Sequence, residues 1–336
     1  MAYCFTMERS IRWGILGPGK IAHKFAAAFE RVPTAKLYAV ASRDAFRGKE
    51  FAEKFGIGKI YTRYEDLADD PDIDIIYVAT PHPFHHAQSL LCLNKKKAVL
   101  CEKPLTMSYQ SAREMVSTAR VQNAFLMEGM WSRFFPSMIK TEALVREGTI
   151  GEIRFIRADF GFASVYDPAG RVFDLRLGGG AQLDVGVYPL FLVLLLLGKP
   201  DKIQAITHRL PTGADETTAV QFHFNNGSLA HILSSVAIDT PKQAEIIGTS
   251  GTITLHAPWH KSQALTLARN SGKPKKFDFP YSGFGFEFEL REVTNQLIQG
   301  NKECEGMSLN FSLMMADAAD EILRQCGVVY PMGQVR

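Results

Sequence analysis

The sequence has few cysteines, and their spacing speaks against two kinds of framework. The five are odd in number and widely spaced, without a CxxC pair. A disulfide scaffold or a structural zinc site needs paired or closely spaced cysteines, so we expect free thiols in a reducing compartment. The first ten residues lack a basic segment followed by an apolar core. No secretory signal is therefore predicted, and we expect a cytoplasmic protein.

The chain also lacks a large charge excess and a long apolar run. Its net charge of +3 is too small to predict nucleic acid or a membrane as a partner. The most apolar window, PLFLVLLLLG (189–198), has about half the length that spans a bilayer and predicts a buried helix. With 336 residues, 46% of them hydrophobic, the composition fits a globular protein of about two domains.

The beginning of the chain contains a dinucleotide-binding pattern. The strand-like run IRWGIL (11–16) leads into GPGKIA, which fits GxGxxA and opens a helix-like segment. The first glycine makes a tight turn, the second lets the backbone approach a pyrophosphate, and the alanine keeps the helix close to the sheet. A structural glycine turn is the alternative, which the strand–turn–helix context disfavours. The predicted cofactor contacts here are Gly17, Gly19, Lys20, Ile21 and Ala22.

The end of the second predicted strand indicates which dinucleotide is bound. An NAD enzyme usually carries an acidic residue there for the ribose 2′-hydroxyl. KLYAVAS (36–42) ends instead at Ser42 and Arg43, whose hydroxyl and guanidinium suit a 2′-phosphate. Asp44 follows and is expected to cap the next helix. The sequence therefore predicts NADP(H), with NAD(H) as the less favoured alternative.

Strands and helices alternate through the first part of the chain, as in an α/β fold. IDIIYVATP (73–81) is nearly all apolar, as a central parallel strand should be, and a further strand ends in CEKP. The alternation predicts a Rossmann domain, a doubly wound parallel sheet, over residues 8–130. Ligands bind such sheets at the C-terminal ends of the strands. Residues predicted at such ends are Thr80, Pro81, Glu102 and Lys103.

After residue 130 the pattern changes to alternating or β-rich runs. Turns such as Asn226-Gly227 and Ser250-Gly251 separate them and indicate hairpins. Two helical stretches close the chain, at 287–299 and 308–326. This pattern predicts an α+β substrate-binding domain with a mostly antiparallel sheet over residues 131–336.

One stretch of this second domain, LGGGAQLDVGVYPL (177–190), carries chemistry. Three glycines in a row let the backbone lie close to a ligand or to another chain segment. Asp184 and Tyr188 are four residues apart, so they share one face if the stretch is helical. Pro189 fits only the first turns of a helix, which places the helix start within a few residues of it.

Taken together, the motifs GPGKIA, ATPHPFHH, CEKP and GGGAQLDVGVY resemble the glucose–fructose oxidoreductase/inositol dehydrogenase (Gfo/Idh/MocA) family over nearly the whole chain. A strand that ends in EKP carries that family's signature lysine. LCEKP, FLMEGMWSRFFP (125–136) and LDVGVY look most like the dimeric dihydrodiol dehydrogenases and the NADP-dependent D-xylose dehydrogenases. Many members have Asn in place of His82 and His in place of Tyr188, and the tyrosine is what the dihydrodiol group carries.

The resemblance implies hydride transfer between nicotinamide and a diol, sugar or related alcohol or carbonyl substrate. Tyr188 would give or take the proton, Lys103 would polarise the substrate oxygen, and Asp184 would orient substrate or lysine. Mutual proximity, together with oxidised nicotinamide, is expected to lower the pKa of both the tyrosine and the lysine. The alternatives are a surface lysine paired with Glu102, a core tyrosine and a helix N-cap.

The resemblance also places other side chains in the site. His82 and His85 would lie near the nicotinamide, with packing at a helix start as the alternative. Trp131, Phe160 and Trp259 resemble aromatic positions that line the substrate pocket, although aromatic residues more often belong to a core.

Three further expectations concern partners. No metal is expected, because the histidines at 82, 85 and 86 have no carboxylate or cysteine nearby in sequence. The family suggests a homodimer or higher homo-oligomer formed through the exposed face of the second sheet. A catalytically silent dinucleotide sensor on the same fold is the alternative function, which an intact set of Lys103, Asp184 and Tyr188 disfavours.

Overall fold

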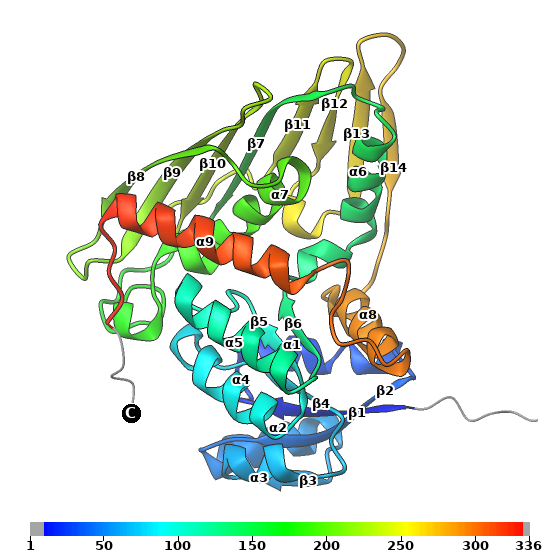
Figure 1. The fold of residues 1–336 in the computed structure, drawn as a ribbon, viewed down its shortest axis with the longest axis vertical. Coiled ribbons are helices and arrows are strands. Elements are labelled where there is room, and N and C mark those ends of the chain that lie inside the picture. The colour runs from blue at the N-terminus through cyan, green and yellow to red at the C-terminus, as the bar shows by residue number, and fades with distance from the viewer. Residues whose placement is uncertain (1–9, 332–336) are drawn as a thin grey trace, which may run out of the picture.

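The computed structural model describes residues 10–331, which form two sheets with helices around them (Figure 1). Sheet A has six parallel strands in the order β3-β2-β1-β4-β5-β6. The order runs outward from β1 in both directions, so the predicted Rossmann sheet is confirmed. Its strands are β1 Ile11–Leu16, β2 Ala35–Ala41, β3 Lys59–Tyr61, β4 Ile75–Val78, β5 Ala98–Glu102 and β6 Leu126–Gly129.

Helices connect these strands and cover the sheet. They are α1 Lys20–Ala26, α2 Ala45–Phe55, α3 Tyr64–Asp69, α4 His85–Asn94 and α5 Tyr109–Val121. All four residues of β4 are buried, which explains why its sequence is apolar without alternation. The predicted cap of α2 is confirmed, because the Asp44 carboxylate accepts the backbone N–H groups of Phe46 and Arg47 at 3.0 and 3.1 Å.

Sheet B has eight strands in the order β14-β13-β12-β11-β7-β10-β9-β8. All neighbouring strands are antiparallel except β7 and β10, so the predicted mostly antiparallel sheet is confirmed. The predicted turns lie between β9 and β10 and between β11 and β12. The strands are β7 Ile153–Gly161, β8 Lys202–Arg209, β9 Asp215–His223, β10 Leu229–Ser235, β11 Ala244–Gly248, β12 Gly251–Leu255, β13 Ala264–Arg269 and β14 Lys275–Asp278.

Helices α6 Pro136–Arg146, α7 Val187–Leu197 and α9 Leu309–Cys326 lie on the same side of sheet B, and the opposite face is uncovered (Figure 1). The first eight residues of α7 are all buried, which confirms the predicted buried helix. By composition and length the stretch Leu175–Leu197 could cross a membrane, with a mean hydropathy of 1.8. However, 83% of its most apolar 18-residue window is buried inside the fold, as a core helix should be.

The two predicted domains are joined by more than one crossing of the chain. The predicted boundary at residue 130 falls directly after β6, but helix α8 Phe286–Ile298 returns to pack against α1, β1 and β2 of the Rossmann domain. Helix α9 contacts α5 on one side and α7 and β8 on the other. The outermost residues of the predicted domains, 8–9 and 332–336, lie outside the described residues.

Candidate active site

A cleft of about 510 Å³ lies at the C-terminal ends of β1, β4 and β5, a size typical of small-molecule sites. Segments from both halves of the chain form its walls. The lining residues are Gly19, Lys20, Ile21, Lys24, Ala79, Thr80, Pro81, His82, His85, Glu102, Lys103, Arg171, Asp184 and Tyr188. Most residues predicted for the cofactor and for the chemistry therefore share one cleft.

The glycine turn at one end of the cleft has the geometry that a dinucleotide needs. Gly17 has φ = 93°, and a Cβ there would lie 2.7 Å from Cγ2 of Thr80. Gly19 precedes the first residue of α1, and no side chain caps that helix. The helix N-terminus therefore keeps backbone N–H groups for an anion, and fully buried Ala22 packs the helix onto the sheet. These residues fit a dinucleotide.

Ser42 and Arg43 lie at the end of β2, outside the residues that line the cleft. The buried Ser42 hydroxyl accepts the backbone N–H of Asp44 at 3.3 Å. The exposed Arg43 guanidinium lies 5.4 Å from the ring centre of Phe84. This cation–π contact holds the guanidinium beside the sheet edge where the glycine turn also lies.

Lys103 leaves the end of β5 and points toward the second half of the chain. Its Nζ donates to the backbone oxygen of Asp184 at 2.5 Å and lies 3.5 Å from that residue's Oδ1. The same Nζ is 5.1 Å from the ring centre of Tyr188. Only 11% of the lysine side chain is exposed, so it is not the surface lysine of the alternative interpretation.

Glu102 does not pair with the Lys103 ammonium in the way that the alternative required. One of its carboxylate oxygens accepts the Tyr77 hydroxyl, and the other accepts the backbone N–H of Lys103 at 3.2 Å. Burial raises the pKa of Glu102, although both hydrogen bonds and the lysine act to lower it. Glu102 therefore anchors the backbone at the end of β5.

Asp184 belongs to a short π-helix, Gln182–Gly186, that continues into α7. Arg171 donates to both of its carboxylate oxygens, at 3.3 and 3.0 Å. Burial alone would raise the pKa of Asp184, but Lys103 and then Arg171 hold it well below its ordinary value. The residue before the π-helix is Ala181, so Asp184 lies within the helix and is not its cap.

Tyr188 lies in the first turn of α7, and its hydroxyl oxygen accepts the N–H of Trp131 at 2.9 Å. Burial, followed by the charge of Glu102, raises the pKa of Tyr188 far above 10. The expected lowering of this pKa is therefore wrong for the protein alone, because desolvation and nearby carboxylates outweigh the lysine. In the protein alone this tyrosine therefore holds its proton at neutral pH.

The two predicted histidines are buried and bind backbone carbonyl groups. His82 Nδ1 lies 3.3 Å from the oxygen of Gly178, and His85 lies 2.8 Å from the oxygens of both Pro104 and Thr80. Burial lowers the pKa of both imidazoles. His85 thus connects the end of β4 to the turn after Lys103, and its place near the nicotinamide stays a prediction.

Of the three aromatic residues predicted to line the substrate pocket, Trp131 and Phe160 lie near Tyr188 and Trp259 does not. Trp131 faces Tyr188, and Phe160 stacks on His260 with ring centres 4.2 Å apart. Trp259 is only 1% exposed, and its N–H donates to the backbone oxygen of Asp159 at 2.8 Å. Trp259 therefore belongs to the core, and the next residue, His260, lies 5.4 Å from the Tyr188 ring instead.

The three glycines at 178–180 let three separate segments approach the chain just before the π-helix. A Cβ on Gly178 would lie 2.9 Å from the Cβ of His82, and one on Gly179 would lie 2.8 Å from the backbone oxygen of Val172. Gly180 has φ = 123°, and its Cβ would lie 2.2 Å from Oδ1 of Asp215. The glycines thus serve packing between chain segments, which the sequence had left open.

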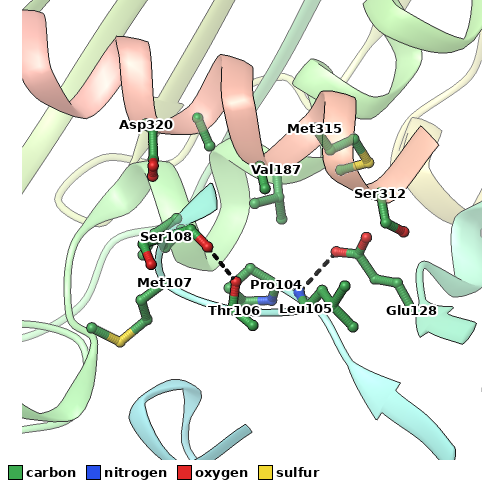
Figure 2. A pocket seen from close by; sticks show the side chains of 13 residues that line it. Pro104, Leu105, Thr106, Met107, Ser108, Glu128, Val187, Ser312, Met315 and Asp320 are labelled. Carbon is green, nitrogen blue, oxygen red and sulfur yellow. Dashed lines mark hydrogen bonds between the residues drawn. The ribbon is translucent and has the colours of Figure 1, made fainter. Parts of the chain in front are cut away.

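A small cavity lies behind the turn that follows Lys103 (Figure 2). Its volume of about 20 Å³ is enough for one water molecule. On its wall the Glu128 carboxylate accepts the backbone N–H of Leu105 at 2.9 Å, and the Thr106 hydroxyl donates to the backbone oxygen of Ser108 at 2.7 Å. These bonds fix the chain that leads away from the lysine.

Two residues that the sequence did not reveal contribute to the site. Arg171 comes from an irregular segment after β7 and holds Asp184, and Asp215 starts β9 and accepts the backbone N–H of Gln182 at 2.6 Å. Neither belongs to a recognisable motif. Two other arginines, Arg133 and Arg176, pair with carboxylates at 2.8 and 2.7 Å and do not line the cleft.

The fold and the cleft together define an oxidoreductase that uses a nicotinamide dinucleotide. A model of the "Oxidoreductase family, NAD-binding Rossmann fold" matches residues 11–130, and one of the "GFO/IDH/MocA C-terminal domain" matches residues 138–254. The chain therefore belongs to the Gfo/Idh/MocA oxidoreductase family, and the expected family, enzyme class and type of cofactor are confirmed.

Similar proteins of known name are dehydrogenases and reductases. The trans-1,2-dihydrobenzene-1,2-diol dehydrogenases of Danio rerio and Homo sapiens are 40% and 35% identical, over 96% of this chain and 98% of theirs. A 3-ketoreductase from Actinomadura kijaniata, solved with NADP and TDP-benzene, has a TM-score of 0.84 at 25% identity, covering 94% of this chain and 98% of its own. The aldose-aldose oxidoreductase of Caulobacter crescentus, at 24% identity and a TM-score of 0.86, shares the fold over 95% of this chain and 98% of its own.

Proposed function

We propose that this protein is an NADP(H)-dependent dehydrogenase that acts on trans-dihydrodiols, sugars or related alcohols. One observation carries the proposal. A single cleft is lined both by part of the dinucleotide fingerprint, Gly19 to Ile21, and by Lys103, Asp184 and Tyr188. The names of the dihydrodiol dehydrogenase relatives support a diol as the first substrate to test.

The cofactor would be held by groups at the ends of β1 and β2. Backbone N–H groups at the start of α1 bind the pyrophosphate. Ser42 and Arg43 bind the 2′-phosphate, for which the arginine supplies a charge-assisted, forked contact. When bound, the nicotinamide supplies the acceptor or donor of the hydride.

The remaining chemistry is movement of one proton at the substrate oxygen. The Lys103 ammonium binds that oxygen and stabilises the negative charge that develops on it. The Tyr188 hydroxyl, which burial keeps protonated, donates its proton to the oxygen during reduction. Oxidation runs this transfer in reverse, with the phenolate form of Tyr188 taking the proton of the substrate hydroxyl.

The test measures NADP⁺ reduction with trans-1,2-dihydrobenzene-1,2-diol, D-xylose, D-glucose and inositol, with NAD⁺ as the cofactor control. Turnover with a diol or sugar is expected in the wild type. Lys103→Met should abolish it and leave the affinity for NADPH within about twofold, because the lysine lies away from the phosphates. Lys199→Met is the matched control, since that lysine is exposed and paired with Asp317 at 2.8 Å.

Two outcomes would contradict this proposal. Full activity of Lys103→Met would remove the lysine from the mechanism. Tight binding of NADPH without turnover of any substrate would favour the silent sensor.

The uncovered face of sheet B supports assembly into a homodimer. It presents Ile206 and Leu229, which are 74% and 46% exposed, and a hollow of about 300 Å³ between Arg157, His231 and Glu245. These apolar side chains are accessible to a second copy of the chain, which is the arrangement that the family resemblance suggests. Ile206→Asp should shift the protein to a monomer in light scattering at micromolar concentration, and a wild type that is already monomeric would contradict the assignment.

A reducing, cytoplasmic location remains part of the proposal. In the part of the chain that the structure describes, Cys92, Cys101, Cys304 and Cys326 are unpaired and buried. Reduced thiols of this kind suit a reducing compartment. Cell fractionation with an antibody to the protein tests the location directly.

A further inference from the structure

Arg171 makes a contact in the active site that the proposed chemistry does not yet use. It lies in the irregular segment between β7 and the π-helix, and its side chain is 44% exposed. Its two terminal nitrogens donate to the two carboxylate oxygens of Asp184 at 3.3 and 3.0 Å. Within residues 10–331 no other side chain donates a hydrogen bond to that carboxylate.

The position of Lys103 depends on this contact. Its ammonium has three N–H groups, and one donates to the backbone oxygen of Asp184. The distance of 3.5 Å between Nζ and Oδ1 of Asp184 is too long for a hydrogen bond. The carboxylate thus stabilises the ammonium by its charge and does not occupy a second N–H group.

A planar guanidinium fork is well suited to hold a carboxylate in this way. Both oxygens of Asp184 face the two terminal nitrogens of Arg171, which fixes the plane of the carboxylate. We propose that Arg171 is a positioning residue, which keeps Asp184 from closing onto Lys103 and so leaves N–H groups of the lysine for the substrate oxygen. The inference rests on the role proposed above for Lys103.

Loss of the guanidinium has a definite structural consequence. Only 11% of the Asp184 side chain is exposed, so the carboxylate cannot replace the lost donors fully with water. The nearest cation is the Lys103 ammonium, and a small rotation closes the 3.5 Å gap. The substrate oxygen then competes with a closed, buried ion pair for the same N–H groups.

The experiment compares Arg171→Met and Arg171→Lys with the wild type. Hydrogen bonds to charged groups contribute enough that kcat of Arg171→Met should fall about 10- to 100-fold. The affinity for NADPH should stay within about twofold, and Arg171→Lys should recover part of the rate. Arg176→Met is the matched control, because Arg176 pairs with Asp174 at 2.7 Å and does not line the cleft. Its kcat should equal that of the wild type.

A crystal structure of Arg171→Met gives a readout that does not depend on activity. The distance between Nζ of Lys103 and Oδ1 of Asp184 should shorten from 3.5 Å to a hydrogen bond of about 2.8 Å. An unchanged distance, or wild-type kcat in Arg171→Met, would overturn the inference. If the wild type itself turns over no substrate, the proposed function fails, while the distance still decides the role of Arg171.

Discussion

Replacement of Asp215 by asparagine should stabilise the protein at neutral pH and leave its stability in acid unchanged. The Asp215 carboxylate is completely buried and accepts the backbone N–H of Gln182 at 2.6 Å and the hydroxyl of Thr218 at 3.1 Å. Within residues 10–331 no basic side chain forms a salt bridge with it. Burial therefore outweighs these hydrogen bonds and raises the pKa of Asp215 to about 6.

The magnitude follows from the difference between folded and unfolded pKa values. With 3.8 as the unfolded value, a shift to about 6 corresponds to about 3 kcal/mol, at about 1.36 kcal/mol per pKa unit. Between these two values the folded protein binds more protons than the unfolded chain, so the stability falls as the pH rises. The cost of the ionised carboxylate is complete above about pH 6 and absent below about pH 4.

The assay is urea unfolding of wild type and Asp215→Asn at intervals from pH 4 to 8. Above pH 6 the Asp215→Asn variant should unfold at a higher urea concentration than the wild type. The difference between their unfolding midpoints should vanish toward pH 4. Asp174→Asn is the matched control of opposite sign, since the hydrogen bond from Arg176 lowers the pKa of Asp174 and stabilises the fold at neutral pH. A difference that is independent of pH, or an asparagine variant less stable at pH 7, would refute the reasoning.

Three further predictions concern the site. Tyr188→Phe should reduce kcat about 10²- to 10⁴-fold, as measured by NADPH oxidation. Trp131→Phe should have a smaller effect, because it removes the hydrogen bond to that tyrosine but leaves the tyrosine hydroxyl in place. Arg43→Gln should weaken NADP⁺ binding about 10- to 100-fold and leave NAD⁺ binding unchanged in calorimetry, and an equal loss for both would contradict the assignment. Gly180→Ala, where φ is 123° and the new Cβ would lie 2.2 Å from Asp215, should destabilise the fold by at least about 2 kcal/mol in urea unfolding.

The Rossmann half was predictable because its signals are local. Apolar runs that alternate with helical segments predict a parallel sheet, and the crossover rule then determines the right-handedness of its connections. Strand β3 was not predicted, because its three residues, Lys59–Tyr61, are too few for a periodic pattern. The spacing of Asp184 and Tyr188 places them on one face only if their stretch is helical, and the π-helix at Gln182–Gly186 has no signal in composition.

The parts of the site that the sequence could not reveal depend on long-range packing. Arg171 contacts Asp184 from an irregular segment, and Asp215 contacts Gln182 from the start of strand β9. The order of Trp259 and His260 around a tight turn decides which ring faces Tyr188, and no periodicity specifies it. The direction in which the pKa of Tyr188 shifts could not be predicted either, because it depends on the burial of this side chain near Glu102.

The burial of α7, the helix that carries Tyr188, limits how such a protein can diversify. Residues 187–194 of α7 are enclosed by the core, so random substitution around Tyr188 is constrained by packing before it can alter chemistry. The segment that carries Arg171 is a surface loop, which tolerates change more readily. Selection can therefore explore new specificities through that loop while the reaction itself is inherited intact. An engineer who seeks a different product should randomise the loop around an unchanged Arg171 and leave the helix alone.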